Sequence, residues 1–90
     1  MATEEIELDL HGRPVGVPRE IVSRLAAAAT ARAGVSSRHR DLSLVLGRGL
    51  DAGRVRLSRS EARTLRAVLE EQQSGFGAEG EELFRAASEL

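Results

Sequence analysis

Residues 4–17 have the sequence EEIELDLHGRPVGV, whose pattern predicts the fold of the N-terminal part of the chain. Apolar and acidic side chains alternate up to Leu10, which is the period of a strand with one buried and one solvated face. The turn signal HGRP follows at residues 11–14, and a second alternation surrounds Gly16. A β-hairpin is therefore predicted over residues 4–17. Its predicted inner face consists of Ile6, Leu8, Leu10, Val15 and Val17.

Helices are expected to cover this hairpin, because a lone hairpin is only marginally stable in water. The spacing of apolar residues predicts helices near residues 18–33, 38–52 and 58–73. Pro18 suits the first turn of the first helix, where its missing N–H costs nothing. Gly34 is expected to end that helix at about residue 33.

The second of these helices is the ambiguous one. The apolar residues of 42–46 fit a helical stripe, but they also fit an alternating strand. Gly47 and Gly49 each weaken the helix by about 1 kcal/mol relative to alanine. We favour the helix, and a strand that ends in a glycine loop stays open as the alternative.

A short third strand and a helix start are indicated at residues 54–61. Residues 54–57 (RVRL) could pair with the hairpin and so relieve its exposed edge. Residues 58–61 (SRSE) match the capping box, in which the hydroxyl of Ser58 and the carboxylate of Glu61 each accept a hydrogen bond from a free backbone amide.

The chain is predicted to consist of one small globular domain over residues 1–73, a hinge at 74–77 and an acidic amphipathic tail helix over 78–90. The fold class is α+β and helix-dominated, with the N-terminal β-hairpin packed on three to four helices. The tail helix is expected to pack on its own chain or in the groove of a partner. Its predicted partner-binding face consists of Leu83, Phe84, Ala87 and Leu90.

Composition limits the compartment and the chemistry. The chain contains no cysteine, so it has neither disulfides nor a thiolate metal site. Its first ten residues are acidic, and no apolar run approaches the ~20 residues that span a bilayer. We therefore expect a cytoplasmic protein that does not insert in a membrane. All 13 basic residues are arginine, which is typical of a GC-rich bacterial genome.

Charge is distributed unevenly along the chain, although the net charge is only −1. Residues 32–66 contain nine arginines and three carboxylates, whereas residues 67–90 contain one arginine and six glutamates. Arginines at helical spacing in the basic segment share one face and could neutralise a nucleic-acid backbone. The predicted nucleic-acid-binding set is Arg54, Arg56, Arg59, Arg63 and Arg66. The alternative interpretation is a solvated helix face in an arginine-rich protein.

A ten-residue resemblance supplies a further hypothesis. Residues 8–12 (LDLHG) and 46–49 (LGRG) resemble the small MutS-related nuclease or nucleic-acid-binding domain, which has a Leu-Asp-x-His-Gly stretch and a later His-Gly-Lys-Gly loop. The later histidine is replaced here by leucine. The matching positions would be Asp9, His11, Arg48 and Gly49. Without the resemblance, His11 is interpreted as a turn residue of the hairpin.

Other catalytic and ligand sites are not indicated. The two histidines, His11 and His39, lie far apart in sequence without a pattern of paired carboxylates, so we expect no metal site. The serines lie at caps and loops, where local hydrogen bonding accounts for them. We therefore expect no catalytic residue, no cofactor and no small-molecule substrate.

The sequence thus favours a non-enzymatic protein–protein interaction or regulatory module in a bacterial cytoplasm. A homodimer is expected, because the alanine-rich first helix and the small core leave little apolar burial within one chain. A nucleic-acid-binding regulator and a nuclease of the small MutS-related type are the alternatives.

Overall fold

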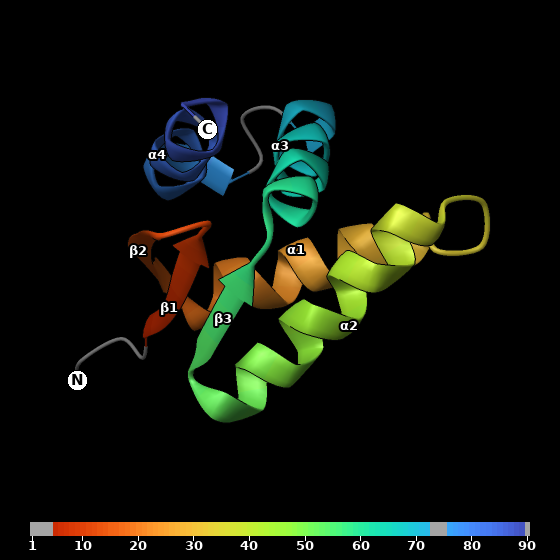
Figure 1. Cartoon of the computed structure of the whole chain (residues 1–90), viewed down its shortest axis with the longest axis horizontal. Helices are drawn as coiled ribbons and strands as arrows, with labels where there is room; N and C mark the ends of the chain where they lie inside the picture. The colour runs from red at the N-terminus through yellow and green to blue at the C-terminus, as the bar shows by residue number, and fades with distance from the viewer. Residues whose placement is uncertain (1–4, 73–75, 90) are drawn as a thin grey trace.

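The structure, a computed structural model, describes residues 5–72 and 76–89. These residues form three strands and four helices, so the helix-dominated α+β fold is confirmed (Figure 1). In chain order the elements are β1 (Glu5–Leu10), β2 (Arg13–Pro18), α1 (Arg19–Ala31), α2 (Ser37–Ala52), β3 (Arg54–Leu57), α3 (Arg59–Gln72) and α4 (Gly77–Ser88).

The three strands form one mixed sheet in the order β2-β1-β3. β1 and β2 make the predicted hairpin, and β3 pairs with β1 in parallel. The turn is shorter than predicted and consists of His11 and Gly12, both with positive φ (53° and 97°). This is the backbone that a two-residue hairpin turn requires. The Asp9 carboxylate supports the turn by accepting a 2.7 Å hydrogen bond from the Gly12 amide.

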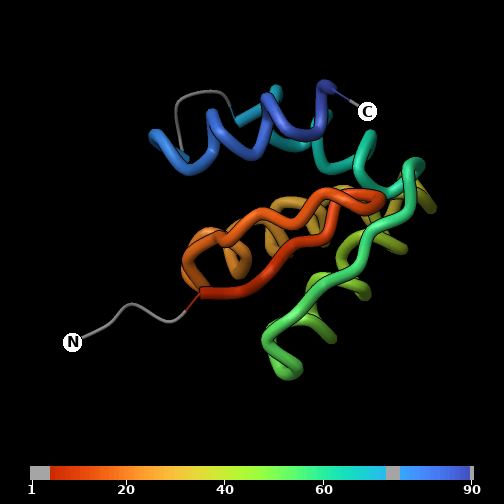
Figure 2. Tube along the Cα trace, turned by 60° about the vertical axis from the view of Figure 1, so that its left-hand side comes forward, coloured from red at the N-terminus to blue at the C-terminus, as the bar shows by residue number. Residues whose placement is uncertain are grey.

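One face of the sheet is the centre of the hydrophobic core. The predicted inner residues of the hairpin are buried except Val15, which is half-buried, and Val55 and Leu57 of β3 join them. α1 and α2 lie behind the strands in Figure 2, whereas α3 and α4 lie side by side above them. There α4 contacts β2, and α3 contacts β3. The opposite sheet face is solvated and carries the charged residues of β1 and β3.

The ambiguous segment 42–46 is helical. α2 begins after Ser36, whose hydroxyl accepts from the His39 amide, and ends at Gly53 with a φ of 80°. Leu42 and Leu46 are fully buried on its inner face. A Cβ on Gly49 would lie 3.1 Å from both the Val55 Cβ and the Arg54 carbonyl oxygen. Gly49 therefore lets the helix approach β3 closely.

Two details of the predicted α1 boundaries were wrong. Pro18 ends β2 and caps α1, and so it precedes the first turn. The helix ends at Ala31, before the position at which Gly34 was expected to stop it. The last carbonyls, those of Ala29 and Thr30, accept from the next backbone amides in tighter turns, so no glycine cap is needed.

The capping box is confirmed at the start of α3. The Ser58 amide donates to the Glu61 carboxylate at 2.9 Å, and the Glu61 amide donates to the Ser58 hydroxyl at 3.2 Å. These bonds hold the start of α3 directly at the end of β3, because only Ser58 separates the two elements.

The acidic tail helix packs on its own chain. α4 lies against α3 and β2, and Leu83 and Ala87 are buried in the same core as the sheet. An ion pair between Arg13 and Glu89 links β2 to the residue after α4. Residues 74 and 75 of the predicted hinge lie outside the described residues, as does Leu90. Phe76 is buried, with the Arg24 guanidinium 4.8 Å from its ring centroid.

Candidate functional site

The five arginines of the predicted nucleic-acid site do not form one continuous basic surface. Two of them project from the solvated face of β3, where β1 supplies carboxylates in register. Arg54 lies opposite Glu7, and its Nε is 3.0 Å from the Glu7 carboxylate. Arg56 lies opposite Asp9 in the strand register but forms no ion pair with it. The neighbouring carboxylates partly cancel the positive potential that a phosphate backbone would need.

The other three arginines lie on α3 and are all exposed. The Arg66 guanidinium lies over the Phe84 ring of α4, at 5.5 Å from its centroid. Within residues 5–72 and 76–89, Arg59 and Arg63 form no ion pair. Among the described residues, three of the five arginines, Arg56, Arg59 and Arg63, thus have neither an ion pair nor an aromatic partner, and Arg56 still lies in register with Asp9.

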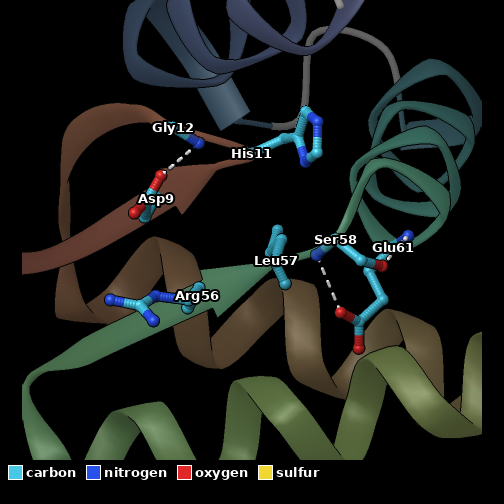
Figure 3. A pocket seen from close by; sticks show the side chains of 7 residues that line it. All are labelled: Asp9, His11, Gly12, Arg56, Leu57, Ser58 and Glu61. Atoms are coloured by element: carbon cyan, nitrogen blue, oxygen red, sulfur yellow. Dashed lines mark hydrogen bonds between the residues drawn. The ribbon is translucent and has the colours of Figure 1, made fainter.

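An open concavity of about 570 Å³ lies where the parallel strands β1 and β3 end (Figure 3). Its lining residues come from β1, the hairpin turn, β3 and the start of α3, and they are Asp9, His11, Gly12, Arg56, Leu57, Ser58 and Glu61. The carboxyl ends of parallel strands are a common place for ligand sites, so the concavity is a natural candidate.

The carboxylates of this concavity already have structural partners. Asp9 accepts from the Gly12 amide and so holds the hairpin turn, whereas Glu61 accepts from the Ser58 amide and so caps α3. The two remaining ionisable side chains, His11 and Arg56, extend in different directions in Figure 3. The arrangement therefore accounts for turn and cap stability without assembling a reacting group and its base.

The four positions of the small MutS-related resemblance are not brought together. Asp9 and His11 lie at the carboxyl end of β1, beside the end of β3. Arg48 and Gly49 lie within α2, and Gly49 touches the beginning of β3 instead. Because residues 46–49 are helical, they also do not form the loop that the resemblance implies.

A second concavity of about 750 Å³ runs between α3 and α4. Its lining combines apolar and charged side chains of the two helices, namely Leu69, Glu70, Gly80, Glu81, Phe84, Arg85 and Ser88. We call this the α3–α4 groove. The sequence identified Phe84 as a contact residue but missed Glu70 and Glu81, because which faces of two helices adjoin depends on their packing.

The predicted partner-binding residues of the tail separate into two groups. Leu83 and Ala87 are turned into the core and are 0% and 3% exposed. Phe84 is partly exposed and lines the α3–α4 groove. Leu90 lies outside the described residues, so Phe84 is the member of the set that the structure places on an accessible surface.

Neither histidine takes part in a metal-ligand cluster. His11 lies in the hairpin turn, and His39 lies in the first turn of α2 with its Nδ1 2.8 Å from the Ser36 hydroxyl. Over residues 5–72 and 76–89, no group of three or more His, Asp or Glu side chains is arranged to hold a metal ion. No helix in the same part of the chain is long and apolar enough to cross a membrane.

Comparison of the chain with known protein families, with curated proteins and with solved structures finds no match. Of the two concavities, the α3–α4 groove is the one whose carboxylates, Glu70 and Glu81, form neither a hydrogen bond nor an ion pair with a described residue, whereas Asp9 and Glu61 of the first concavity each hold a backbone amide.

Proposed function

We propose that this protein is a non-enzymatic interaction or regulatory module that binds another protein through the α3–α4 groove. The observation that carries the proposal is the position of Phe84, whose ring is only partly buried and lines the groove together with Leu69. Partly exposed aromatic side chains in a concave surface are typical anchors of protein interfaces.

The helices that form the groove are firmly held, which favours a preformed binding surface. α4 is fixed by Leu83 in the core, and α3 is fixed at its start by the Ser58–Glu61 capping box. A preformed groove binds a partner without the entropic cost of ordering its own walls. Phe84 is kept in place from one side by the Arg66 guanidinium.

Other exposed apolar side chains do not offer a comparable surface. Among the described residues, the exposed large hydrophobic side chains are Val35, in the connection between α1 and α2, and Leu44, on α2. Neither lines the groove, and single exposed apolar residues are normal on protein surfaces. The predicted homodimer therefore becomes the hypothesis that a second copy occupies the α3–α4 groove.

Site-specific photo-crosslinking in cells tests the proposal. A photoreactive phenylalanine analogue replaces Arg85 at the groove, and the control carries the same analogue at Ser23 on the exposed face of α1. We expect a discrete heavier adduct from position 85, its loss when Phe84 is also changed to serine, and no such adduct from position 23. Equal adducts from both positions, or none from position 85, would refute binding through the groove.

A further inference from the structure

The walls of the α3–α4 groove carry carboxylates that have no partner among the described residues. Glu70 lies on α3 and Glu81 on α4, so the two helices each present an acidic side chain to the groove. Both residues are exposed, and neither forms an ion pair within residues 5–72 and 76–89. Of the other four glutamates in residues 67–90, Glu71 is paired with Arg32 and Glu89 with Arg13, whereas Glu79 and Glu82 do not line the groove.

The surroundings of the groove reinforce its negative charge. Four exposed glutamates of α3 and α4 form no ion pair with a described residue, whereas two arginines lie at the groove, Arg85 in its lining and Arg66 over the Phe84 ring; the four are Glu70, Glu79, Glu81 and Glu82. Summed charges of one sign around a concave apolar surface attract ligands of the opposite sign and raise their association rate. The groove is therefore electrostatically matched to a cationic ligand.

The shape and lining of the groove indicate what kind of cation fits. Phe84 provides partly exposed apolar area between the acidic walls, with a small contribution from Leu69, which is 4% exposed. The α4 wall extends from Gly80 to Ser88, which is about 12 Å at the rise of an α-helix and corresponds to about two helical turns. A free metal ion or a small polyamine would leave this apolar surface unused.

We propose that the α3–α4 groove binds a basic amphipathic helix of a partner protein. A large apolar side chain of that helix packs on Leu69 and Phe84, and lysines or arginines on either side of it pair with Glu70 and Glu81. This is the helix-in-groove mode of recognition, in which the apolar face of a helix packs into a groove. Here the two glutamates would favour a helix with basic residues beside its apolar face. The proposal rests on the proposed function and specifies its partner.

Two model peptides test the charge selection directly. Both are helical and about two to four turns long with the same leucine stripe, and the flanking positions are all lysine in one peptide and all glutamate in the other. The full chain, labelled with ¹⁵N, is titrated with each peptide. We expect the lysine peptide to shift the amide signals of Glu70, Gly80, Glu81 and Phe84, and to bind at least about tenfold more tightly than the glutamate peptide at low salt.

Substitution of the two carboxylates provides the matched variants. Glu70→Gln with Glu81→Gln should weaken binding of the lysine peptide about tenfold and flatten its salt dependence. The control, Glu20→Gln with Asp51→Asn, makes the same change of net charge at exposed positions that do not line the groove, and it should leave binding within about twofold. Circular dichroism of both variants verifies that they are folded.

The outcomes separate this proposal from the proposed function. Equal affinity for both peptides would overturn charge selection and leave the groove as an interaction surface. Absence of binding by either peptide would also overturn the basic helix, while the crosslinks from position 85 decide independently whether the groove binds a protein. A dimer in light scattering that the Glu70→Gln, Glu81→Gln variant dissociates would replace the basic helix with a second copy of the chain.

Discussion

Replacing Gly49 with alanine should destabilise the protein, although alanine is the better helix former. A Cβ at this position would overlap the Cγ2 of Val55 and lie 3.1 Å from both the Val55 Cβ and the Arg54 carbonyl oxygen. Val55 is 1% exposed, so its methyl group has little space into which it can rotate. The two further atoms belong to β3 itself and move only if the strand moves.

The expected loss follows from two opposing terms. Inserting a methyl group into a packed core costs about 1–3 kcal/mol, and the upper end applies because the contacted atoms are rigid. The gain in helix propensity is about 1 kcal/mol, which leaves a net loss of about 2 kcal/mol. For a domain of this size, such a loss lowers the Tm by roughly 8–16 °C.

Gly47 provides the matched control in the same helix. No atom lies within 4 Å of an added Cβ there, so Gly47→Ala should gain about 1 kcal/mol from helix propensity alone. The two variants should therefore differ by about 3 kcal/mol in the free energy of unfolding. Urea unfolding followed by far-UV circular dichroism measures this difference.

A compensating substitution tests the cause of the loss. Val55→Ala removes the methyl group that the new Cβ would overlap, so Gly49→Ala and Val55→Ala together should cost at least about 1 kcal/mol less than their sum. If Gly49→Ala proves as stable as Gly47→Ala, α2 does not pack against β3 at Gly49.

Three further variants or measurements address the tail, the cap and the arginines. Leu83→Ala should lower the free energy of unfolding by about 2–5 kcal/mol, because Leu83 is fully buried. Hydrogen exchange of the β1 amides should accelerate in this variant, and unchanged protection of those amides would show that the tail helix is a separable unit. Ser58→Ala should lower the stability measured by thermal unfolding by about 1 kcal/mol, since it removes the acceptor of the Glu61 amide. Glu61→Gln keeps the capping box and should lower the stability less, and a larger loss for Glu61→Gln than for Ser58→Ala would contradict the capping box. If the predicted arginine set binds DNA, affinity should fall with salt at a log–log slope no steeper than about −2.7, because three of its members, Arg56, Arg59 and Arg63, have no ion pair or aromatic partner among the described residues. A slope near −4.5 by fluorescence anisotropy would restore the five-arginine site.

Much of the secondary structure was predictable because its signals are local. The alternation in residues 4–17 predicted β1 and β2, and the SRSE sequence at 58–61 predicted the start of α3. Both signals depend on neighbours within four positions, so they do not require knowledge of the fold. The α1 end was mispredicted because a glycine cap is one of several ways to satisfy the last carbonyls, and tight turns to Ala29 and Thr30 took its place.

The candidate site was less predictable than the fold. Helical spacing correctly placed Arg63 and Arg66 on exposed positions of α3, but it could not show that Arg66 lies over Phe84 of a helix further along the chain. In the same way, the charge of Arg54 was evident, whereas its pairing with Glu7 required the parallel register of β1 and β3. A charge count along the sequence therefore overstated the basic surface.

Outside residues 42–46, periodicity and capping predicted which segments are strands and which are helices, and which side of each is apolar, because these signals act over a few residues. How the elements meet, and that residues 42–46 are helical, depended on packing across the whole chain. The parallel pairing of β3 with β1 set carboxylates against arginines, and the burial of Leu83 directed the tail helix onto its own chain. The α3–α4 groove exists for the same reason, since it joins Glu70 and Glu81 across two helices whose relative position depends on packing of the whole core.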